Sequence, residues 1–489
     1  MNIITCIAVV FFSHILWHGN CQNSTDHSIS DKRFQADIVS IFVINSELPV
    51  SLEIIRPALE LATTQINEKY SNIKFNIVFR DGASSCKANV AGAYAAEEYF
   101  LRRVTAFVGP ACTLALDPVG RMASYWNIPI YTAGGIDTTV SDKSIFTTLT
   151  RLSFSLEGAA NFILEILKEF NWHHIAIIVD ETNLQKILMK RSLVDIFKDI
   201  NDYEIFYSLK EFSQKSFIDA NFTKLLTEAS KEARVFVFVA GWEIIRSLLL
   251  EAYNLGMGDG EYTFFTFQLI ENKEKYGEIS WYKPGDYRNK NARKMYEALM
   301  VVTLRVPATL QYKQFSAKVL ENSRLKYNSN ADETMVDPIL GAFYDCVLIY
   351  GHILNKTLVE GGDPLDGRTL AKKLWNSTFY GGMAGDIFIN ANGDREADYT
   401  LSDLDPETGI MRPVATYYGI RRRYEKIPGT YIHWPGGLDG PPPDIPYCGF
   451  TGDALHCLPQ KSFPVLGSVG ITVFGLCVFG SIAGALLYK

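Results

Sequence analysis

Apolar runs alternate with helical patterns through most of this chain, and the alternation begins again near its middle. Helices of about 10–15 residues between buried strands predict right-handed β-α-β units and a parallel sheet. The elements expected in the first half are strands at 37–44, 75–79, 106–108 and 128–131 and helices at 55–66, 89–101 and 115–125.

The second half repeats this design. Two doubly wound sheets in series predict an α/β fold of two lobes with a cleft between them, over residues 34–445. The expected elements are helices at 155–170, 217–230 and 242–255 and strands at 175–179, 203–207, 235–239 and 262–267. Later helices are expected at 292–304, 311–327 and 338–358, followed by a hairpin of 386–390 and 396–401 around Asn392-Gly393.

An uncharged stretch lies near the C-terminus, because Ser462 to Tyr488 contains no Asp, Glu, Lys or Arg. As a helix, Val465–Tyr488 would rise ~36 Å at ~1.5 Å per residue. That length exceeds the ~30 Å hydrocarbon core of a membrane. Residues 464–488 are therefore predicted to be a transmembrane helix, joined to the lobes by a short stem at 446–463 that follows the prolines Pro441-Pro442-Pro443.

The N-terminus predicts export. Residues 3–16 are mostly apolar and are followed by small and polar residues, which is typical of a cleaved signal peptide over residues 1–21. No Lys or Arg precedes the apolar run, so a retained anchor is the alternative. Together the two ends predict a single-pass type I protein of the plasma membrane, with its lobes outside the cell and Lys489 inside.

Composition narrows the function classes. The chain carries 47 Lys and Arg against 54 Asp and Glu, a net charge of −7 without long charge blocks. This balance argues against nucleic-acid binding. In an exported chain, Asn-x-Ser/Thr triplets are candidate glycosylation sites, and they occur at Asn23, Asn221, Asn355 and Asn376.

Cysteines are few. Five lie in the predicted extracellular part, so one must stay free or pair between chains. Cys448 and Cys457 are nine residues apart in the loop-rich stem and can pair easily, and Cys86 and Cys112 each follow an apolar strand, so both can lie at one sheet edge. Cys346 lies in a helical pattern; a buried, inert thiol is expected, with an intermolecular bridge as the alternative.

The most specific internal stretch is Val108-Gly109-Pro110-Ala111-Cys112, where an apolar strand ends and a helix begins a few residues later. Free backbone N–H groups at such a helix start favour an anion. A tight turn without a ligand is the alternative.

Several segments resemble the extracellular domains of the natriuretic peptide receptors and, more broadly, of the receptor guanylyl cyclases, which share the type I periplasmic-binding-protein fold. The resemblance covers about 34–457. The stem, with Trp434-Pro435-Gly436-Gly437 and Cys448-Gly449-Phe450, resembles the cyclase-bearing members. The other matching segments are Arg80-Asp81, Gly109-Pro110-Ala111-Cys112, Pro118-Val119-Gly120-Arg121, Trp126-Asn127-Ile128-Pro129 and Thr132-Ala133-Gly134.

The resemblance implies covalent and ionic features. It implies one disulfide between Cys86 and Cys112 and a second between Cys448 and Cys457. It also implies a chloride on the backbone N–H groups of Ala111 and Cys112, and a homodimer formed through the ectodomain. Within the predicted membrane helix, Gly480-x-x-x-Gly484 is a further candidate dimer contact.

Two departures from the family pattern concern the ligand. The disulfide of the second lobe has no counterpart, because no Cys occurs between Thr113 and Asp345. Leu114 stands where the vertebrate hormone receptors place a tyrosine. These departures argue against a natriuretic peptide itself, but not against the architecture.

Catalytic and metal motifs are weak. The chain lacks a P-loop, a His-Glu-x-x-His pair and a Gly-x-Ser-x-Gly elbow. His173-His174 has no second metal-spaced pair, and the alternating Asn390, Asn392, Asp394 and Glu396 fit a turn better than a calcium loop. We therefore predict no catalytic residue, no metal and no cofactor beyond the chloride.

The expected function is a single-pass cell-surface receptor whose cleft, or whose dimer interface, binds an extracellular ligand, most simply a peptide. Alternatives are a clearance or decoy receptor without catalytic output, and a chain whose transcript continues past Lys489 into kinase-like and cyclase domains. A different class is an amino-acid-sensing receptor of the glutamate type, although Thr132-Ala133-Gly134-Gly135 offers glycines where such receptors place hydroxyls.

Overall fold

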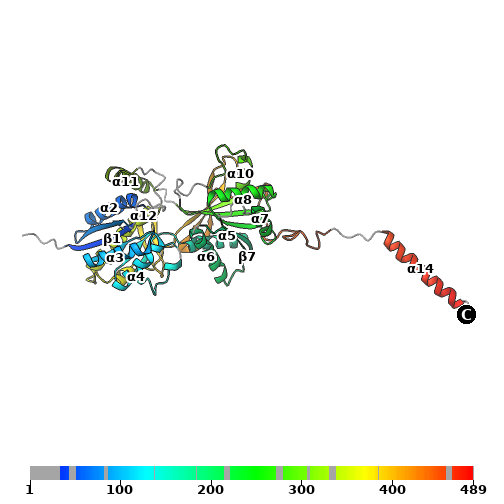
Figure 1. The fold of residues 1–489 in the computed structure, drawn as a ribbon, viewed down its shortest axis with the longest axis horizontal. Helices are drawn as coiled ribbons and strands as arrows, with labels where there is room; N and C mark the ends of the chain where they lie inside the picture. The colour runs from blue at the N-terminus through cyan, green and yellow to red at the C-terminus, as the bar shows by residue number, and fades with distance from the viewer. Residues whose placement is uncertain are drawn as a thin grey trace, which may run out of the picture.

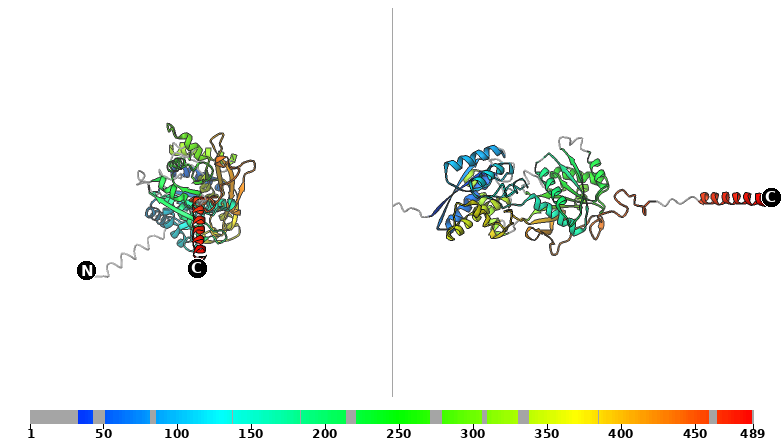
Figure 2. Two further views of the ribbon diagram at one scale, coloured as in Figure 1. Left: turned by 90° about the vertical axis from the view of Figure 1, so that its right-hand side faces the viewer. Right: turned by 90° about the horizontal axis from the view of Figure 1, so that it is seen from below.

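The computed structural model shows two α/β lobes in a row, a segment leaving the second lobe, and a separate C-terminal helix (Figures 1 and 2). The structure describes residues 33–42, 51–81, 86–136, 138–182, 184–213, 221–270, 279–305, 309–329, 338–383, 385–458 and 465–487. The predicted signal peptide, residues 1–21, and the candidate glycosylation site Asn23 lie outside the described residues.

Lobe 1 contains a parallel five-stranded sheet in its described residues. Its strands, in sheet order, are β2 (Ile73–Asp81), β1 (Phe34–Phe42), β3 (Val104–Val108), β4 (Ile130–Thr132) and β5 (Leu149–Arg151). Its helices are α2 (Leu52–Lys69), α3 (Ala88–Leu101), α4 (Thr113–Trp126), α11 (Leu310–Tyr327), α12 (Pro338–Val359) and α13 (Gly367–Lys372). The last three return from later in the chain, and α11 and α12 both pack against α2.

Lobe 2 contains an eight-stranded mixed sheet, again counted over its described residues. Five strands are parallel: β7 (Phe206–Phe212), β6 (His174–Asp180), β8 (Val235–Val239), β9 (Thr263–Gln268) and β10 (Leu299–Leu304). Three antiparallel strands extend the sheet beyond β10: β13 (Tyr399–Leu404), β14 (Met411–Tyr418) and β15 (Arg423–Lys426). Its helices are α5 (Leu156–Phe170), α6 (Leu184–Asp199), α7 (Phe222–Ser230), α8 (Trp242–Asn254) and α10 (Asn289–Tyr296).

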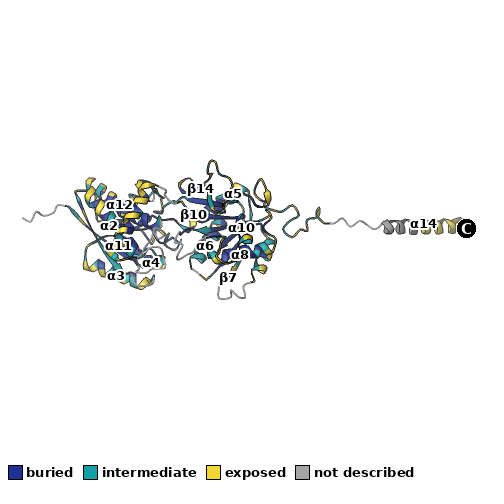
Figure 3. Cartoon of the chain, turned by 90° about the horizontal axis from the view of Figure 1, so that it is seen from above, coloured by how far each residue is buried: buried dark blue, intermediate teal, exposed yellow. Residues whose placement is uncertain are grey.

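The core explains why these segments adopt these elements. The central strands read as continuous apolar runs, such as Val235–Val239, and every residue of that strand is buried, as expected for a sheet covered on both faces. One apolar cluster extends through both lobes, and two further clusters fill the outer faces of the two sheets. Figure 3 shows the buried residues along the sheets and the exposed ones on outward helix faces.

Two predicted elements are wrong. The segment predicted as a helix over 292–304 is the short helix α10 followed by strand β10, because Leu299-Met300-Val301-Val302 forms a buried strand beside β9. The predicted strand at 203–207 begins later, at Phe206. Helix α6 was not predicted at all, since its apolar residues do not form a regular stripe.

The predicted hairpin of 386–390 and 396–401 is confirmed only next to its turn, where Ile389 bridges Arg395 in antiparallel fashion and the Glu396 N–H donates to Phe388 O at 3.1 Å. A tight turn is present, with the Gly393 N–H donating to Asn390 O at 3.0 Å. The flanking strands separate, however: β12 (Gly385–Ile389) pairs with β11 (Ser377–Gly382) beside lobe 1, whereas β13 joins the sheet of lobe 2. The turn therefore lies where the chain passes from one lobe to the other.

Helix α14 (Val465–Leu487) occupies the position predicted for the membrane anchor. None of the helices has, over its described residues, the length and apolar character that crossing a membrane requires. The membrane span therefore stays a prediction.

Candidate functional site

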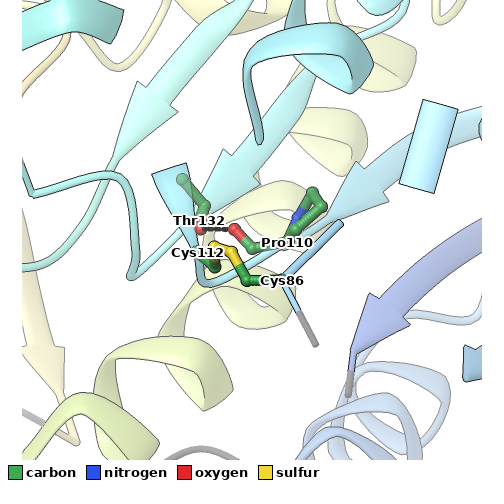
Figure 4. The surroundings of a disulfide bond; sticks show 4 residues. All are labelled: Cys86, Pro110, Cys112 and Thr132. Carbon is green, nitrogen blue, oxygen red and sulfur yellow. Dashed lines mark hydrogen bonds between the residues drawn. A yellow bond between two sulfur atoms is a disulfide. The ribbon is translucent and has the colours of Figure 1, made fainter. Parts of the chain in front are cut away.

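The glycine–proline turn after β3 is held by a short series of hydrogen bonds. The hydroxyl of Thr132, at the end of β4, donates to Pro110 O at 2.7 Å and accepts from the Gly134 N–H at 2.9 Å. The Gly135 N–H donates to Ala111 O at 3.0 Å. Figure 4 shows the bond between Thr132 and Pro110 beside the neighbouring disulfide.

Gly134 explains why this turn needs a glycine. A Cβ atom on Gly134 would lie 1.8 Å from Ala111 O, which no side chain can tolerate. The loops after β3 and β4 therefore touch backbone to backbone, as parallel strands allow at their carboxyl ends. The segment Thr132-Ala133-Gly134 is thus tied physically to Gly109-Pro110-Ala111-Cys112, with which it shares the resemblance.

A disulfide joins Cys86 to Cys112, with 6.1 Å between their Cα atoms (Figure 4). Cys86 precedes helix α3, and Cys112 is the residue that caps the start of α4. The bond therefore ties together the starts of two neighbouring helices. This is the pairing that the resemblance implies.

The predicted anion site lies at the same turn. Among the described residues, the backbone N–H groups of Ala111 and Cys112 donate to no other group, and Cys112 makes no side-chain cap on α4. Two free donors at a helix start suit a halide. The residues present therefore fit the chloride that the resemblance implies, which remains a proposal.

A buried ion cluster lies where the chain passes between the lobes. Arg151, the last residue of β5, binds Asp394 through two hydrogen bonds of 2.6 and 2.8 Å. The Lys143 ammonium donates to the same carboxylate at 3.1 Å. Backbone bonds accompany the ion pair, since Arg151 N–H donates to Gly393 O and Arg395 N–H donates to Arg151 O. Two passages between the lobes are therefore joined directly.

Protonation in this cluster follows from burial and charge. Burial raises the pKa of the Asp394 carboxyl, but the hydrogen bond and charge of Arg151, aided by Lys143, outweigh it, and the pKa lies below its ordinary value. Burial lowers the pKa of Lys143 to about 8 despite the attraction of Asp394, and the positive charge of Arg151 adds to that effect. We infer that Arg151 is the principal counterion of Asp394.

An exposed aromatic patch covers the ends of α3 and α4. We define it by Tyr99, Phe100, Tyr125 and Trp126. Tyr99 and Trp126 stack in parallel with 4.1 Å between ring centroids, whereas Phe100 and Tyr125 are 81% and 86% exposed. Large exposed aromatic groups gathered at one place are typical of an interaction surface.

The segment at 434–450, which we call the docked segment, is attached to lobe 2. Asp444 accepts hydrogen bonds from the backbone N–H groups of His173 and His174 at 2.7 and 2.8 Å, and His174 Nδ1 lies 2.7 Å from its second oxygen. The Trp172 indole N–H donates to Pro442 O at 2.8 Å. These contacts lie at the amino end of β6, the end of the sheet remote from lobe 1 (Figure 1).

Two further contacts fix the docked segment. Trp434 is buried and meets Phe170 edge to face, with 5.4 Å between ring centroids. Arg234, just before β8, donates to Phe450 O at 3.0 Å and lies over the Phe450 ring. The disulfide between Cys448 and Cys457 closes a small loop that begins within the last residues of this segment. The stem is thus held against lobe 2 at its beginning.

The remaining candidate residues are placed as follows. Asn221 and Asn376 are exposed, whereas Asn355 is half-buried in α12 and the Thr357 of its triplet is buried. Cys346 is fully buried in α12, and burial raises the pKa of its thiol. Burial of this kind matches the expected inert thiol.

Sequence reasoning missed the ion cluster and the docked contacts. Arg151 and Asp394 are 243 positions apart, and His174 and Asp444 are 270 apart. The sequence signal near Asp394 was its alternating polar run, and that run indicated a turn but no ion pair.

Comparison with known proteins agrees with this architecture. Residues 54–407 match the family described as the receptor family ligand binding region. Atrial natriuretic peptide receptor 3 of Homo sapiens is 27% identical over 401 residues, which cover 78% of this chain and 71% of the relative. Receptor-type guanylate cyclase gcy-28 of Caenorhabditis elegans is also 27% identical, over 78% of this chain but 33% of the relative. Atrial natriuretic peptide receptor 2 of Anguilla japonica is 24% identical over 88% of this chain and 41% of the relative.

The family match covers most of both lobes, including the glycine–proline turn, the ion cluster and the crossings between the lobes. The chain therefore belongs to the receptor ligand-binding-region family, with relatives among the atrial natriuretic peptide receptors and the receptor-type guanylate cyclases.

Proposed function

We propose that this chain is the ligand-binding part of a single-pass receptor of the plasma membrane, and that its ligand is an extracellular peptide. The observation that carries the proposal is the match of the bilobed body to a receptor ligand-binding region, together with relatives named as natriuretic peptide receptors. Peptide binding by this chain is an inference from those names. The exposed sites Asn221 and Asn376 are the proposed glycan positions.

We propose further that the receptor acts as a homodimer through the aromatic patch of Tyr99, Phe100, Tyr125 and Trp126. The disulfide between Cys86 and Cys112 ties the starts of the two helices that carry the patch. Rigid aromatic side chains lose little conformational entropy on binding, so they suit a contact between copies. Ligand bound across two copies would favour one of two dimer arrangements.

The docked segment supports a route for the signal. Lobe 2 holds this segment through Asp444, Trp434 and Phe450. A change in the relative orientation of two lobe 2 domains would therefore move the two stems with them. The proposed output is a shift in the separation or rotation of two α14 helices.

The test uses the full chain in lipid nanodiscs and a panel of secreted peptides. We expect one peptide class to bind with saturation, and the aspartate variant Phe100→Asp to abolish the dimer in mass photometry. The matched control is Tyr287→Asp, since Tyr287 is 93% exposed on lobe 2 and lies outside the patch. Absence of any peptide binding would overturn the ligand assignment, and a dimer that survives Phe100→Asp would overturn the dimer face.

We also propose that a chloride binds the N–H groups of Ala111 and Cys112. These groups donate to no other group among the described residues. Replacing chloride by gluconate should lower the thermal midpoint of the full chain, because binding to the folded state alone stabilises it. An unchanged midpoint across chloride concentrations would contradict the site.

A further inference from the structure

A pocket in lobe 2 has no role in the proposed receptor mechanism. It lies at the carboxyl ends of β6, β8 and β9, beside the first turns of α6 and α8. The strand order β7-β6-β8-β9 reverses direction at β6. This is the topological switch point, where open α/β sheets bind ligands. The docked segment attaches at the opposite end of the same sheet, so the pocket faces lobe 1.

The pocket has the size of one small ring. Its volume is about 160 Å³, close to the roughly 150 Å³ of an apolar cavity that accommodates benzene. Its walls are mainly apolar and come from separate elements: Met189 from α6, Trp242 and Ile245 from α8, and Leu269 from the loop after β9.

Four polar residues line the same pocket: Gln185, Lys186, Thr266 and Gln268. The Lys186 ammonium donates to the fully buried Asp180, which fixes its position. An ammonium has three N–H donors, so two remain for a ligand. A Cβ built on Gly241 would lie 3.5 Å from Lys186 Nζ, which places the ammonium at the pocket's Gly241 side.

The buried carboxylate Asp180 keeps the pocket close to neutral. Burial raises the pKa of Asp180, but the hydrogen bonds from Lys186 and Thr182 outweigh it, and the pKa lies below its ordinary value. The Asp180–Lys186 pair is therefore charged on both sides. The Asp180 carboxylate faces Thr182 and Lys186. The polar group that the pair presents to the pocket is therefore an N–H donor of Lys186.

We propose that this pocket binds a benzene-sized apolar group that carries a hydrogen-bond acceptor, with the ring between Met189, Trp242 and Leu269 and the acceptor on Lys186 and Gln268. Burial of the ring removes apolar surface from water, and a fixed polar pair orients the ligand. A free aromatic acid and an aromatic side chain of a peptide share this chemistry. The site is separate from the dimer face, so it does not depend on the proposed function.

The experiment measures ligand binding to the full chain in nanodiscs by ligand-observed NMR, with empty nanodiscs as background. The probe is 3-phenylpropionate. We expect it to bind at least tenfold more tightly than propionate, which lacks the ring, and than 3-phenylpropylamine, whose ammonium repels Lys186. N-acetyl-phenylalanine amide forms a second arm. Tighter binding of the amide assigns the peptide source, and tighter binding of the acid assigns the free molecule.

Glycine variants locate the site. Gly241 has φ −73° and ψ 157°, an extended conformation that any residue can adopt, so Gly241→Leu should fold and place its side chain toward Lys186. We expect at least a tenfold loss of probe binding. Gly440→Leu is the matched control, because a Cβ on Gly440 meets nothing within 4 Å and the residue lies far from the pocket.

Lysine variants test the polar end. Lys186→Met should remove the preference for the acid over the amine, whereas Lys190→Met should keep it, because Lys190 pairs instead with Glu181 and Glu211. Lys186→Met leaves Asp180 without its cation and is expected to destabilise the fold. The Gly241→Leu result therefore decides: probe binding that survives this variant would overturn the proposal.

Discussion

The two lobes share one strand order but differ in what they attach to. Lobe 1 has the order β2-β1-β3-β4-β5, and the parallel part of lobe 2 has the equivalent order β7-β6-β8-β9-β10. Lobe 2 alone continues into three antiparallel strands and alone holds the docked segment. Lobe 1 instead carries the disulfide at its turn and the aromatic patch. One frame thus carries the proposed dimer face in the first lobe and the docked segment in the second.

Two buried carboxylates, one in each lobe, differ in their partners. Glu98 in α3 of lobe 1 is fully buried, but Arg80 and Arg102 both pair with it. Asp403 in β13 of lobe 2 is fully buried and accepts one hydrogen bond, from the His433 N–H at 2.7 Å. Among the described residues its other oxygen has no hydrogen-bond partner. Glu98 is thus paired with two arginines, whereas Asp403 accepts a backbone N–H and has no ion pair among the described residues. The buried Asp180 of lobe 2 is paired with Lys186.

The largest expected effect comes from breaking the joint between the lobes. Asp394→Ala leaves Arg151 and Lys143 buried without their counterion, and we expect a loss of about 3 kcal/mol in the free energy of unfolding. Urea unfolding followed by tryptophan fluorescence measures it. The control is Asp117→Ala, whose exposed pair with Arg121 should change stability by less than about 0.5 kcal/mol. Equal effects of the two variants would show that the ion cluster does not join the lobes.

A smaller effect is expected at the stem. Asp444→Ala leaves the partly buried N–H groups of His173 and His174 without their acceptor, which should cost about 2 kcal/mol locally. Hydrogen exchange at these two amides should become faster while exchange in lobe 1 stays unchanged. Asp439→Ala, an exposed change in the same segment, is the control. Protection that persists in Asp444→Ala would mean that this residue does not hold the segment.

A third effect concerns pH and is spread over several pH units. Burial raises the pKa of Asp403 to about 7, with the His433 N–H acting in the opposite direction. The folded state therefore binds this proton more tightly than the unfolded state, and stability should fall as pH rises between about 4 and 7, by of the order of 1 kcal/mol per pH unit. Asp403→Asn should remove that slope. A wild-type slope retained in this variant would assign the pH dependence to other groups.

The sequence predicted the repeating α/β pattern because that pattern is local. Strand β8 was predicted at its observed bounds, since five consecutive apolar residues leave little choice. Strand β10 was missed because a short apolar run next to a helix fits either structure. The hairpin pairs only as far as Ile389 and Arg395, because beyond them Tyr399 pairs with Leu304 in β10 instead of with its neighbour in sequence.

The candidate sites also differ in whether their residues lie close together in the sequence. The glycine–proline turn and the cysteines were recognisable, since their residue types are unusual and close in sequence. The Asp394 cluster and the Asp444 contacts join residues more than 200 positions apart. Neither periodicity nor spacing in the sequence identifies such distant partners. Only the folded arrangement of the two lobes shows their contacts.

The docked segment has a mechanical consequence. Its described contacts are with lobe 2, and the crossings bonded at Arg151 and Asp394 are one connection through which a tilt of lobe 1 reaches it. In the proposed single-pass receptor, lobe 2 would be the lobe nearest the bilayer, and the crossings would act as the hinge between the lobes. With a rigid hinge, a small displacement at the outer end of lobe 1 would rotate lobe 2 and the docked segment together.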